Sequence, residues 1–288
     1  MPEERKSDDL TGRELLLKAH DACCETLLQL AGHFNLRLPM EGLQGLRISI
    51  LIATAIKAVN SSHAIRLLCV ERPYFEEMYI LDRSLIESIV NGAFLQFAID
   101  EELTAFENFD TISLSKAIRI AETISPGGVD LLSRKLRDEF RQHADSVKTM
   151  IGKDEKEFSW TRLDVVAKGD RIDKGLGRQT FEPLCKVLFP DCHAFVHGSY
   201  RSLEAYMPSE TGKLSEDFLN FQADGALHTM NVALLCLCIT MNHFSTVRQE
   251  NQLIVIQSLL VAFSERVRTS FPQTAARAAE SYRRRQSG

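Results

Sequence analysis

Apolar residues recur at helical spacing over most of this 288-residue chain, and the longest uninterrupted stretch runs from Pro73 to Asp100. Projected at 100° per residue, this stretch has one apolar and one polar side, which is the pattern of an amphipathic helix. A proline suits the first turn of such a helix. The apolar side comprises Phe75, Met78, Leu85, Ile86, Ile89, Ala93 and Phe97.

Three charged residues of this predicted helix are the first candidate site residues. Asp82 falls in the middle of the apolar side, whereas Arg83 and Glu87 lie four residues apart at its edge and can pair. A carboxylate on a buried helix face needs a hydrogen-bonding partner or a raised pKa. We therefore expect a polar centre at this point of the fold.

The remaining pattern predicts more helices, with no convincing strand alternation and no repeat of fixed length. Residues 160–177 are expected to form a flexible connection, because their glycines follow no strand and make no phosphate loop. Pro190 and Pro272 are expected to end helices, and Asp191 to cap the next one. The predicted fold is all-α, a single bundle of about ten helices. These helices cover about 11–32, 43–62, 73–100, 101–109, 114–124, 130–156, 179–188, a helix from 191, 215–248 and 251–270.

The predicted domain organisation is simple. Residues 1–9 form a flexible tail, residues 10–271 a single helical domain, and residues 272–288 a basic tail that contains Arg283, Arg284 and Arg285. Charged and polar chain ends of this kind are commonly frayed.

The composition argues against a nucleic-acid-binding, membrane-bound or secreted protein. A hydrophobic content of 44% is ample for a core, and a net charge of −5 gives no global reason to bind nucleic acid or an anionic membrane. The first residues lack the apolar core of a signal peptide, and the runs Val232–Thr240 and Leu253–Phe263 are shorter than the roughly 20 residues of a membrane span. Seven cysteines lie mostly in apolar helical patterns, as reduced core thiols do. We expect a cytoplasmic protein with no membrane partner.

A second group of candidate residues follows Asp191. His193 and His197 are four residues apart, and Arg201 and Glu204 join the same face if the helix continues past Gly198. Two such histidines can bind zinc, but the inner glutamate of HExxH and an obvious third ligand are absent. A solvated polar face, a phosphate-handling or acid–base centre and a metal site stay open, with no metal or cofactor predicted.

A third polar stripe lies on the long helix 215–248, where Asp224, His228, Asn231 and Asn242 recur at helical spacing. Buried Asn and His side chains must find hydrogen bonds. The simplest inference is that the polar residues of three helices meet inside the bundle. Such a centre is either a satisfied structural network or a functional site.

Several short motifs resemble a known family. Leu81-Asp-Arg-Ser-Leu-Ile-Glu87, Trp160 and Phe195-Val-His-Gly-Ser199 are similar to the uncharacterised bacterial helical family named domain of unknown function 5677. In that family a helix with Arg-Ser-x-x-Glu precedes a segment ending in His-Gly or His-Ser. The resemblance covers about residues 45–245. It implies that Arg83, Glu87 and His197 are family-type polar positions, whereas Asp82 departs from the family pattern.

That family is in turn reminiscent of helical domains from bacterial toxin and phage-defence systems, some of which are metal-independent ribonucleases with an Arg-x(4–6)-His motif. The matches here, Arg13 to His20 and Arg137 to His143, carry no information, because about two are expected by chance. A ribonuclease assignment therefore depends on fold analogy alone.

Three hypotheses follow, and the third is a metal site formed by His193 and His197 with a carboxylate such as Glu204, Asp82 or Glu87. The first is a bacterial module, in phage defence or a stress system, that binds a small polar ligand or a partner protein. The second is a ribonuclease in which Arg83 holds a phosphate, His197 moves the proton of the attacking 2′-hydroxyl and Glu87 orients one of them. Self-association or a partner protein is expected, and RNA is a candidate partner. Further candidate binding residues are Asp82, His193, Arg201, Glu204, His228 and Asn231.

Overall fold

A computed structural model describes residues 10–37, 42–71, 74–109, 134–151, 161, 163–196 and 216–286. Within these ranges the chain forms helices and no strand, which confirms the predicted all-α fold. A further helical segment at 100–109 matches the predicted 101–109. The named elements are α1 (Gly12–Arg37), α2 (Gly42–Glu71), α3 (Phe75–Phe97), α5 (Arg134–Ile151), α6 (Val165–Leu176), the π-helix η2 (Leu184–Leu188), α7 (Phe189–Val196), α9 (Glu216–Phe244) and α10 (Glu250–Gln286).

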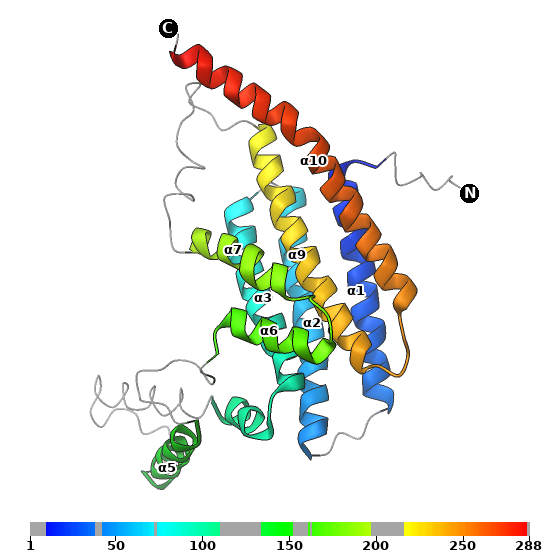
Figure 1. Ribbon diagram of the computed structural model, residues 1–288. Coiled ribbons are helices and arrows are strands. Elements are labelled where there is room, and N and C mark those ends of the chain that lie inside the picture. Colours follow the sequence, from blue (N-terminus) through cyan, green and yellow to red (C-terminus); the bar gives the residue numbers. More distant parts are fainter. Residues whose placement is uncertain are drawn as a thin grey trace.

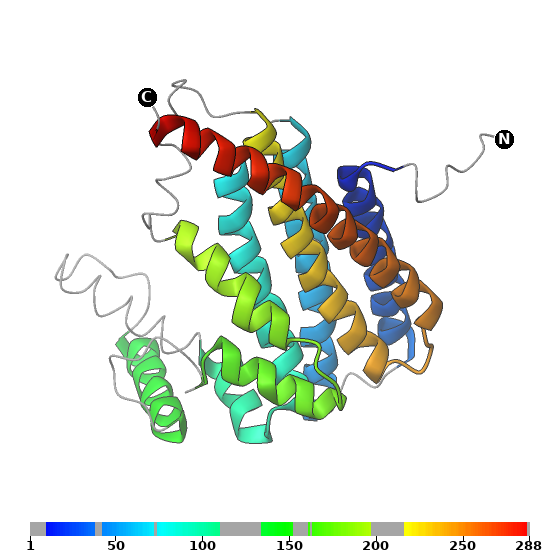
Figure 2. The same ribbon diagram turned by 45° about the horizontal axis from the view of Figure 1, so that its top comes forward.

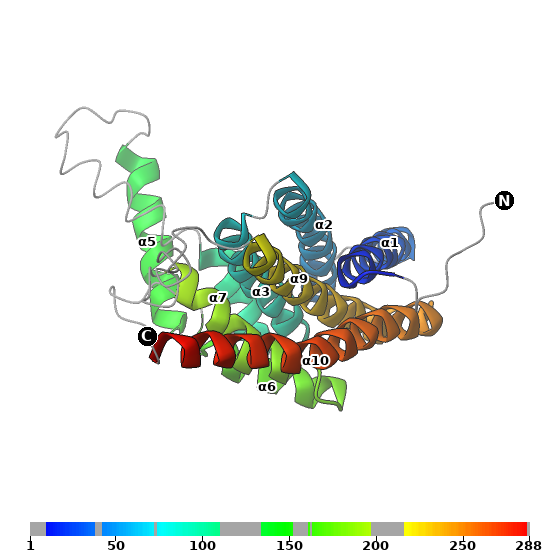
Figure 3. The ribbon, with the colours of Figure 1, turned by 90° about the horizontal axis from the view of Figure 1, so that it is seen from above.

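Helix α3 is the centre of the bundle, because it packs against α2, α6, α7 and α9 (Figure 1). Seen from above, α1, α2, α3 and α9 run side by side (Figure 3). Helix α10 crosses α1 and α9 obliquely (Figure 2). The predicted apolar side of α3 is buried, with Phe75, Met78, Leu85, Ile86, Ile89 and Ala93 each at most 2% exposed.

Helices α2 and α3 approach closely where Gly92 faces Thr54. A Cβ atom on Gly92 would lie 2.8 Å from the Thr54 Cγ2 and 2.9 Å from its Cβ. The Thr54 side chain is held in place, because its hydroxyl donates to the Ile50 carbonyl oxygen at 2.8 Å. This position therefore admits no side chain without a shift of one helix.

We expect Gly92→Ala to lower the free energy of unfolding by about 1–3 kcal/mol, because the added methyl overpacks the contact with Thr54. Gly32→Ala on α1 is the matched control, since nothing lies within 4 Å of the Cβ it would add. That change should raise stability by about 0.5–1 kcal/mol through helix propensity. Urea unfolding of both variants tests the pair, and a Gly92→Ala variant as stable as wild type contradicts the close approach.

Residues 165–176, expected to be flexible, form helix α6 instead. Its first turn is capped by Asp164, whose side chain accepts a hydrogen bond from the Ala167 N–H, and it ends at Gly177 in the left-handed conformation (φ 69°). The internal glycine at 169 serves packing rather than flexibility, because a Cβ there would lie 2.8 Å from the Cys185 sulfur. Tertiary contact therefore overrides the local signal for a loop.

Both predicted proline stops are also wrong. The chain stays helical from 182 to 196 through Pro190, so Asp191 lies in the first turn of α7 and does not cap it. At this point η2 widens the helix, and the Phe189 N–H donates to the Leu184 carbonyl five residues back. Helix α10 likewise continues through Pro272 to Gln286. A proline removes one backbone hydrogen bond, and a helix held on both sides of it can continue with a kink.

Two described helices are long and apolar enough to cross a membrane by length and composition, at Gly42–Val70 and Leu219–Phe244. The second contains the apolar run Val232–Thr240 and extends well beyond it. In the fold, 72% of the second window is buried but only 39% of the first, and α2 leaves Ile56, Leu67 and Val70 exposed. The cytoplasmic location and the absence of a membrane partner stay predictions.

The cysteines follow their predicted role as core thiols. All seven are buried and free. Burial raises the pKa of the Cys185 thiol to about 12, and that of Cys24 to about 11. These groups stay protonated at neutral pH, so they pack as small apolar side chains and are poor nucleophiles.

Candidate functional site

Asp82 is fully buried, as its position on the apolar side of α3 predicts. Neither carboxyl oxygen has a hydrogen-bond partner among the described residues. Burial raises the pKa of Asp82 well above its usual value, so the group is held as a neutral acid. A buried polar group left without a hydrogen bond is costly, and natural proteins contain few of them.

The next residue carries a second unpartnered atom. The Nε of Arg83 is buried and has no hydrogen-bond partner in the described part of the chain. Its Nη2 donates to Glu87 Oε1 at 3.1 Å, the i, i+4 pair expected from the sequence. The Arg83 side chain is 25% exposed and that of Glu87 42% exposed, so this ion pair lies at the surface above the buried acid.

Helix α7 forms the opposite wall of this centre. The Arg83 guanidinium carbon lies 5.8 Å from the centre of the Phe189 ring, which in turn lies 6.2 Å from the His193 ring. Burial raises the pKa of the Cys192 thiol, and the charge of Asp191 adds to the effect while Arg83 opposes it.

Aromatic stacking fixes α7 on α3. The Phe195 ring stacks on Tyr79 with 4.5 Å between ring centres and meets Phe75 edge-on at 6.0 Å. Such pairs add about 0.5–1.5 kcal/mol each to the area that they bury. Of the second predicted group, His193 is exposed on α7 and lies beside the Phe189 ring, near which the Arg83 guanidinium also lies.

The predicted third group lies at another interface. The Asn231 amide of α9 donates to the carbonyl oxygens of Leu16 and Leu227 at 3.0 and 2.8 Å. The ring of His228 stacks on Phe263 of α10 at 5.3 Å, and burial lowers its pKa. These residues therefore tie α9 to α1 and α10. His197, Arg201 and Glu204 lie outside the described residues, and their proposed roles stay predictions.

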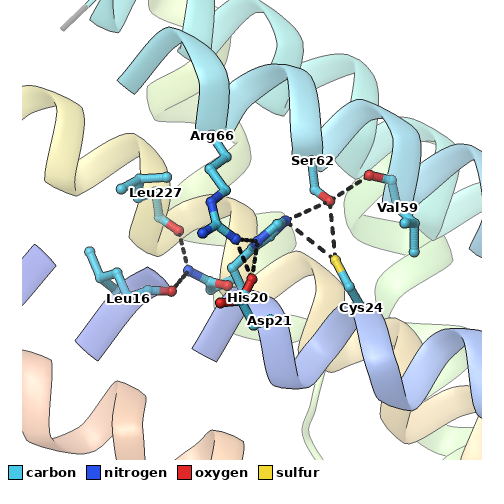
Figure 4. A network of polar contacts seen from close by, with 9 residues as sticks. Leu16, His20, Asp21, Cys24, Val59, Ser62, Arg66 and Leu227 are labelled. Atoms are coloured by element: carbon cyan, nitrogen blue, oxygen red, sulfur yellow. Dashed lines mark hydrogen bonds and ion pairs between the residues drawn. The ribbon is translucent and has the colours of Figure 1, made fainter. Parts of the chain in front are cut away.

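A second polar centre, which the sequence did not predict, joins α1 to α2 (Figure 4). The buried His20 ring contacts Ser62 Oγ through Nε2 at 3.0 Å and Arg66 Nη1 through Nδ1 at 3.2 Å. Arg66 also pairs with Asp21, and Cys24 Sγ lies 3.3 Å from His20 Nε2. The sequence does not indicate this centre, because its residues on α1 and α2 are more than 40 positions apart. The one signal is the spacing of four between His20 and Cys24 on a buried helix face.

The directions of its hydrogen bonds determine which ring nitrogen of His20 carries the proton. Arg66 can only donate, so Nδ1 accepts from it and the ring proton sits on Nε2, which donates to Ser62 Oγ. The Ser62 hydroxyl then donates to the Val59 carbonyl oxygen at 2.8 Å. Burial, followed by the charges of Arg66 and His63, lowers the pKa of His20 to about 4, against the opposing effect of Asp21.

A Cys–His–Asp group suggests nucleophilic catalysis, but this one has the wrong protonation states. A cysteine nucleophile needs a thiolate and a histidine base that can take its proton. Here the Cys24 thiol pKa is raised to about 11 and the His20 pKa is lowered to about 4. The His20 ring is also fully buried. We infer that this centre is a structural network that fixes α1 against α2.

The formal Arg13–His20 motif does not form a ribonuclease-like pair. Arg13 is bound to α9 through Asp224 Oδ1 at 2.6 Å and through Asn220, while His20 belongs to the buried network. His143 contacts Asn108 at 3.0 Å. No group of three residues suited to hold a metal ion occurs among the described residues.

Comparisons with known proteins give one result. The model of a family described as a family of unknown function, DUF5677, matches residues 48–214, which is more than half of the chain. The match contains the whole of α3, α6 and α7, and so the Asp82–Arg83–Glu87 centre. No curated protein matches the chain, and no solved structure matches it.

Proposed function

Because the chain belongs to DUF5677, a family of unknown function, its role has to be argued from its own residues, and we propose that it binds a small phosphate-bearing ligand at the α3–α7 centre. The observation that carries the proposal is the pair of unpartnered buried groups on the consecutive residues Asp82 and Arg83. Proteins keep such costly groups mainly where function needs them.

The chemistry of these groups selects the ligand class. A neutral Asp82 carboxyl and the Arg83 Nε–H are both hydrogen-bond donors that lack an acceptor. The exposed part of the guanidinium adds a positive charge, and arginine binds phosphate through paired hydrogen bonds. A ligand with several anionic oxygens supplies what both groups lack.

The α3–α7 centre is partly closed, so a ligand has to displace existing contacts in order to bind. Glu87 occupies Arg83 Nη2, and Asp82 is covered by its neighbours. Ligand binding therefore exchanges the Glu87 contact for a phosphate and loosens α7, whose interface with α3 contains the unpaired acid.

We expect Arg83→Gln to weaken ligand binding by about 10–100-fold, the worth of a charged hydrogen-bond pair, without loss of folding. The test is isothermal titration of wild type and variant with inorganic phosphate, pyrophosphate and AMP. The matched control is Arg268→Gln on α10, which removes the arginine of another surface pair, with Glu265 at 2.8 Å. Binding of none of the probes, or equal binding by Arg83→Gln, rejects the proposal.

The same proteins decide the nuclease alternative, which assigns catalysis to Arg83, Glu87 and His197. Wild type, Arg83→Gln and His197→Ala are incubated with labelled single-stranded RNA in EDTA. A binding protein leaves the RNA intact in all three samples. Cleavage that resists EDTA and disappears in both variants makes the protein a ribonuclease.

A further inference from the structure

A second site lies where α6 meets η2, away from the α3–α7 centre. The chain forms a surface pocket of about 370 Å³ there, within the range of small-molecule sites. Its lining contains two uncharged residues, Gly177 and Gln179. The charged lining residues are Asp170, Asp173, Lys174, Arg178, Glu182 and Lys186. Three cations and three carboxylates make this lining formally neutral, so it does not attract ions of one sign.

One wall of the pocket is fixed by Asp173. Its carboxylate accepts hydrogen bonds from the backbone N–H groups of Thr180, Phe181 and Glu182 at 2.8, 2.8 and 3.0 Å. Three such bonds hold the turn after α6 rigid and disperse the negative charge of Asp173. The side chain is therefore committed to holding this turn.

Asp170 and Glu182 form an acidic end of the pocket. They share a single ammonium group, since Lys186 Nζ lies 3.5 Å from Asp170 Oδ1 and 3.1 Å from Glu182 Oε1. Both contacts raise the pKa of Lys186, which keeps it charged. Two carboxylates with one cation leave one negative charge without a partner.

Lys174 and Arg178 form a part of the pocket with an excess of positive charge. Both side chains are exposed, and neither has an ion pair or side-chain hydrogen bond among the described residues. They flank Gly177, the left-handed residue that ends α6. Two unpaired cations therefore stand on one rigid turn, next to an acidic end that lacks one positive charge.

We propose that this pocket binds a free amino acid. Its carboxylate would pair with Arg178 and Lys174, and its ammonium group with Asp170 and Glu182. A zwitterion supplies both missing charges at once, whereas a simple anion or a simple cation supplies one and is repelled by the other end. The proposal is independent of the phosphate site, because it involves none of the residues of the α3–α7 centre.

The test uses the full chain and each of the twenty common amino acids in thermal-shift assays, followed by titration calorimetry of the best. We expect saturable binding of one molecule per chain. The N-acetyl and the carboxamide forms of the same amino acid each lack one charge, and each should bind at least tenfold more weakly. The absence of saturable binding by any amino acid, or equal binding of the two derivatives, overturns the proposal.

Variants of the lining residues test whether the amino acid binds in this pocket. Arg178→Gln should weaken binding of the best amino acid at least tenfold, and Glu182→Gln should weaken it as well, although the two changes alter net charge in opposite directions. Lys18→Gln and Glu25→Gln on α1 are exposed, charge-matched controls and should leave affinity unchanged. Arg83→Gln should also leave it unchanged, which separates this site from the phosphate site. Unaltered affinity in Arg178→Gln rejects the pocket.

Discussion

Replacing Asp82 with asparagine is expected to make the protein more stable, and the gain should grow as pH rises. The wild-type carboxyl is fully buried without a hydrogen bond, and burial raises its pKa well above the usual value. Asparagine has nearly the same shape and no charge to lose. A site that gains stability when its acid is removed is a site kept for function.

The direction of the pH effect follows from linkage. The unfolded chain releases the Asp82 proton near pH 4, whereas the folded chain keeps it to a higher pH because its pKa is raised. The folded state therefore binds more protons in that window, and wild type loses up to about 1.4 kcal/mol of stability for each pH unit above 4 until the folded pKa is reached. Asp82→Asn removes this loss.

Urea unfolding at pH 5, 7 and 8.5 measures the difference between the two proteins. The matched control is Asp138→Asn on the exposed face of α5, which should change stability by less than about 0.5 kcal/mol. A difference between wild type and Asp82→Asn that stays constant with pH would mean that the Asp82 carboxyl has an ordinary pKa or a charged partner.

What the sequence predicted correctly depends on single helices. The burial of Asp82 and the pairing of Arg83 with Glu87 follow from one angular projection, since α3 buries the side that its apolar residues mark. Residues on one helix keep a fixed spacing whatever the rest of the fold does. His193 lies on helix α7, as its spacing predicts, four residues after Phe189, near whose ring the Arg83 guanidinium lies.

What the sequence could not predict depends on contacts between helices. The polar stripe of α9 does not say which neighbouring helix Asn231 faces, and only the packing shows that it contacts α1. His20 contacts Ser62 and Arg66, which lie 42 and 46 residues further along the chain. Gly169 favours a flexible segment in the sequence, although the nearby Cys185 sulfur leaves no room there for a side chain. Each of these needs the packing to be known first.

The second large effect is expected at His20, where replacement by alanine should cost about 3–5 kcal/mol at pH 7. The change leaves a cavity between α1 and α2 and removes the acceptor of Arg66 and the donor to Ser62, both from a fully buried ring. His63→Ala is the matched control, since that ring is exposed and meets His20 only edge-on at 5.2 Å. Its cost should be below about 0.5 kcal/mol.

The cost of His20→Ala should shrink in acid, which distinguishes the neutral histidine from a charged one. The unfolded His20 takes up a proton near pH 6.5 and the folded one only near pH 4. Wild type therefore loses about 3 kcal/mol between these values, a loss that the variant does not share. This slope is opposite in sign to that of Asp82, so the two groups offset each other in wild type above pH 4, and each variant removes one of the two contributions. Parallel curves for wild type and His20→Ala from urea unfolding would mean that His20 is protonated in the fold.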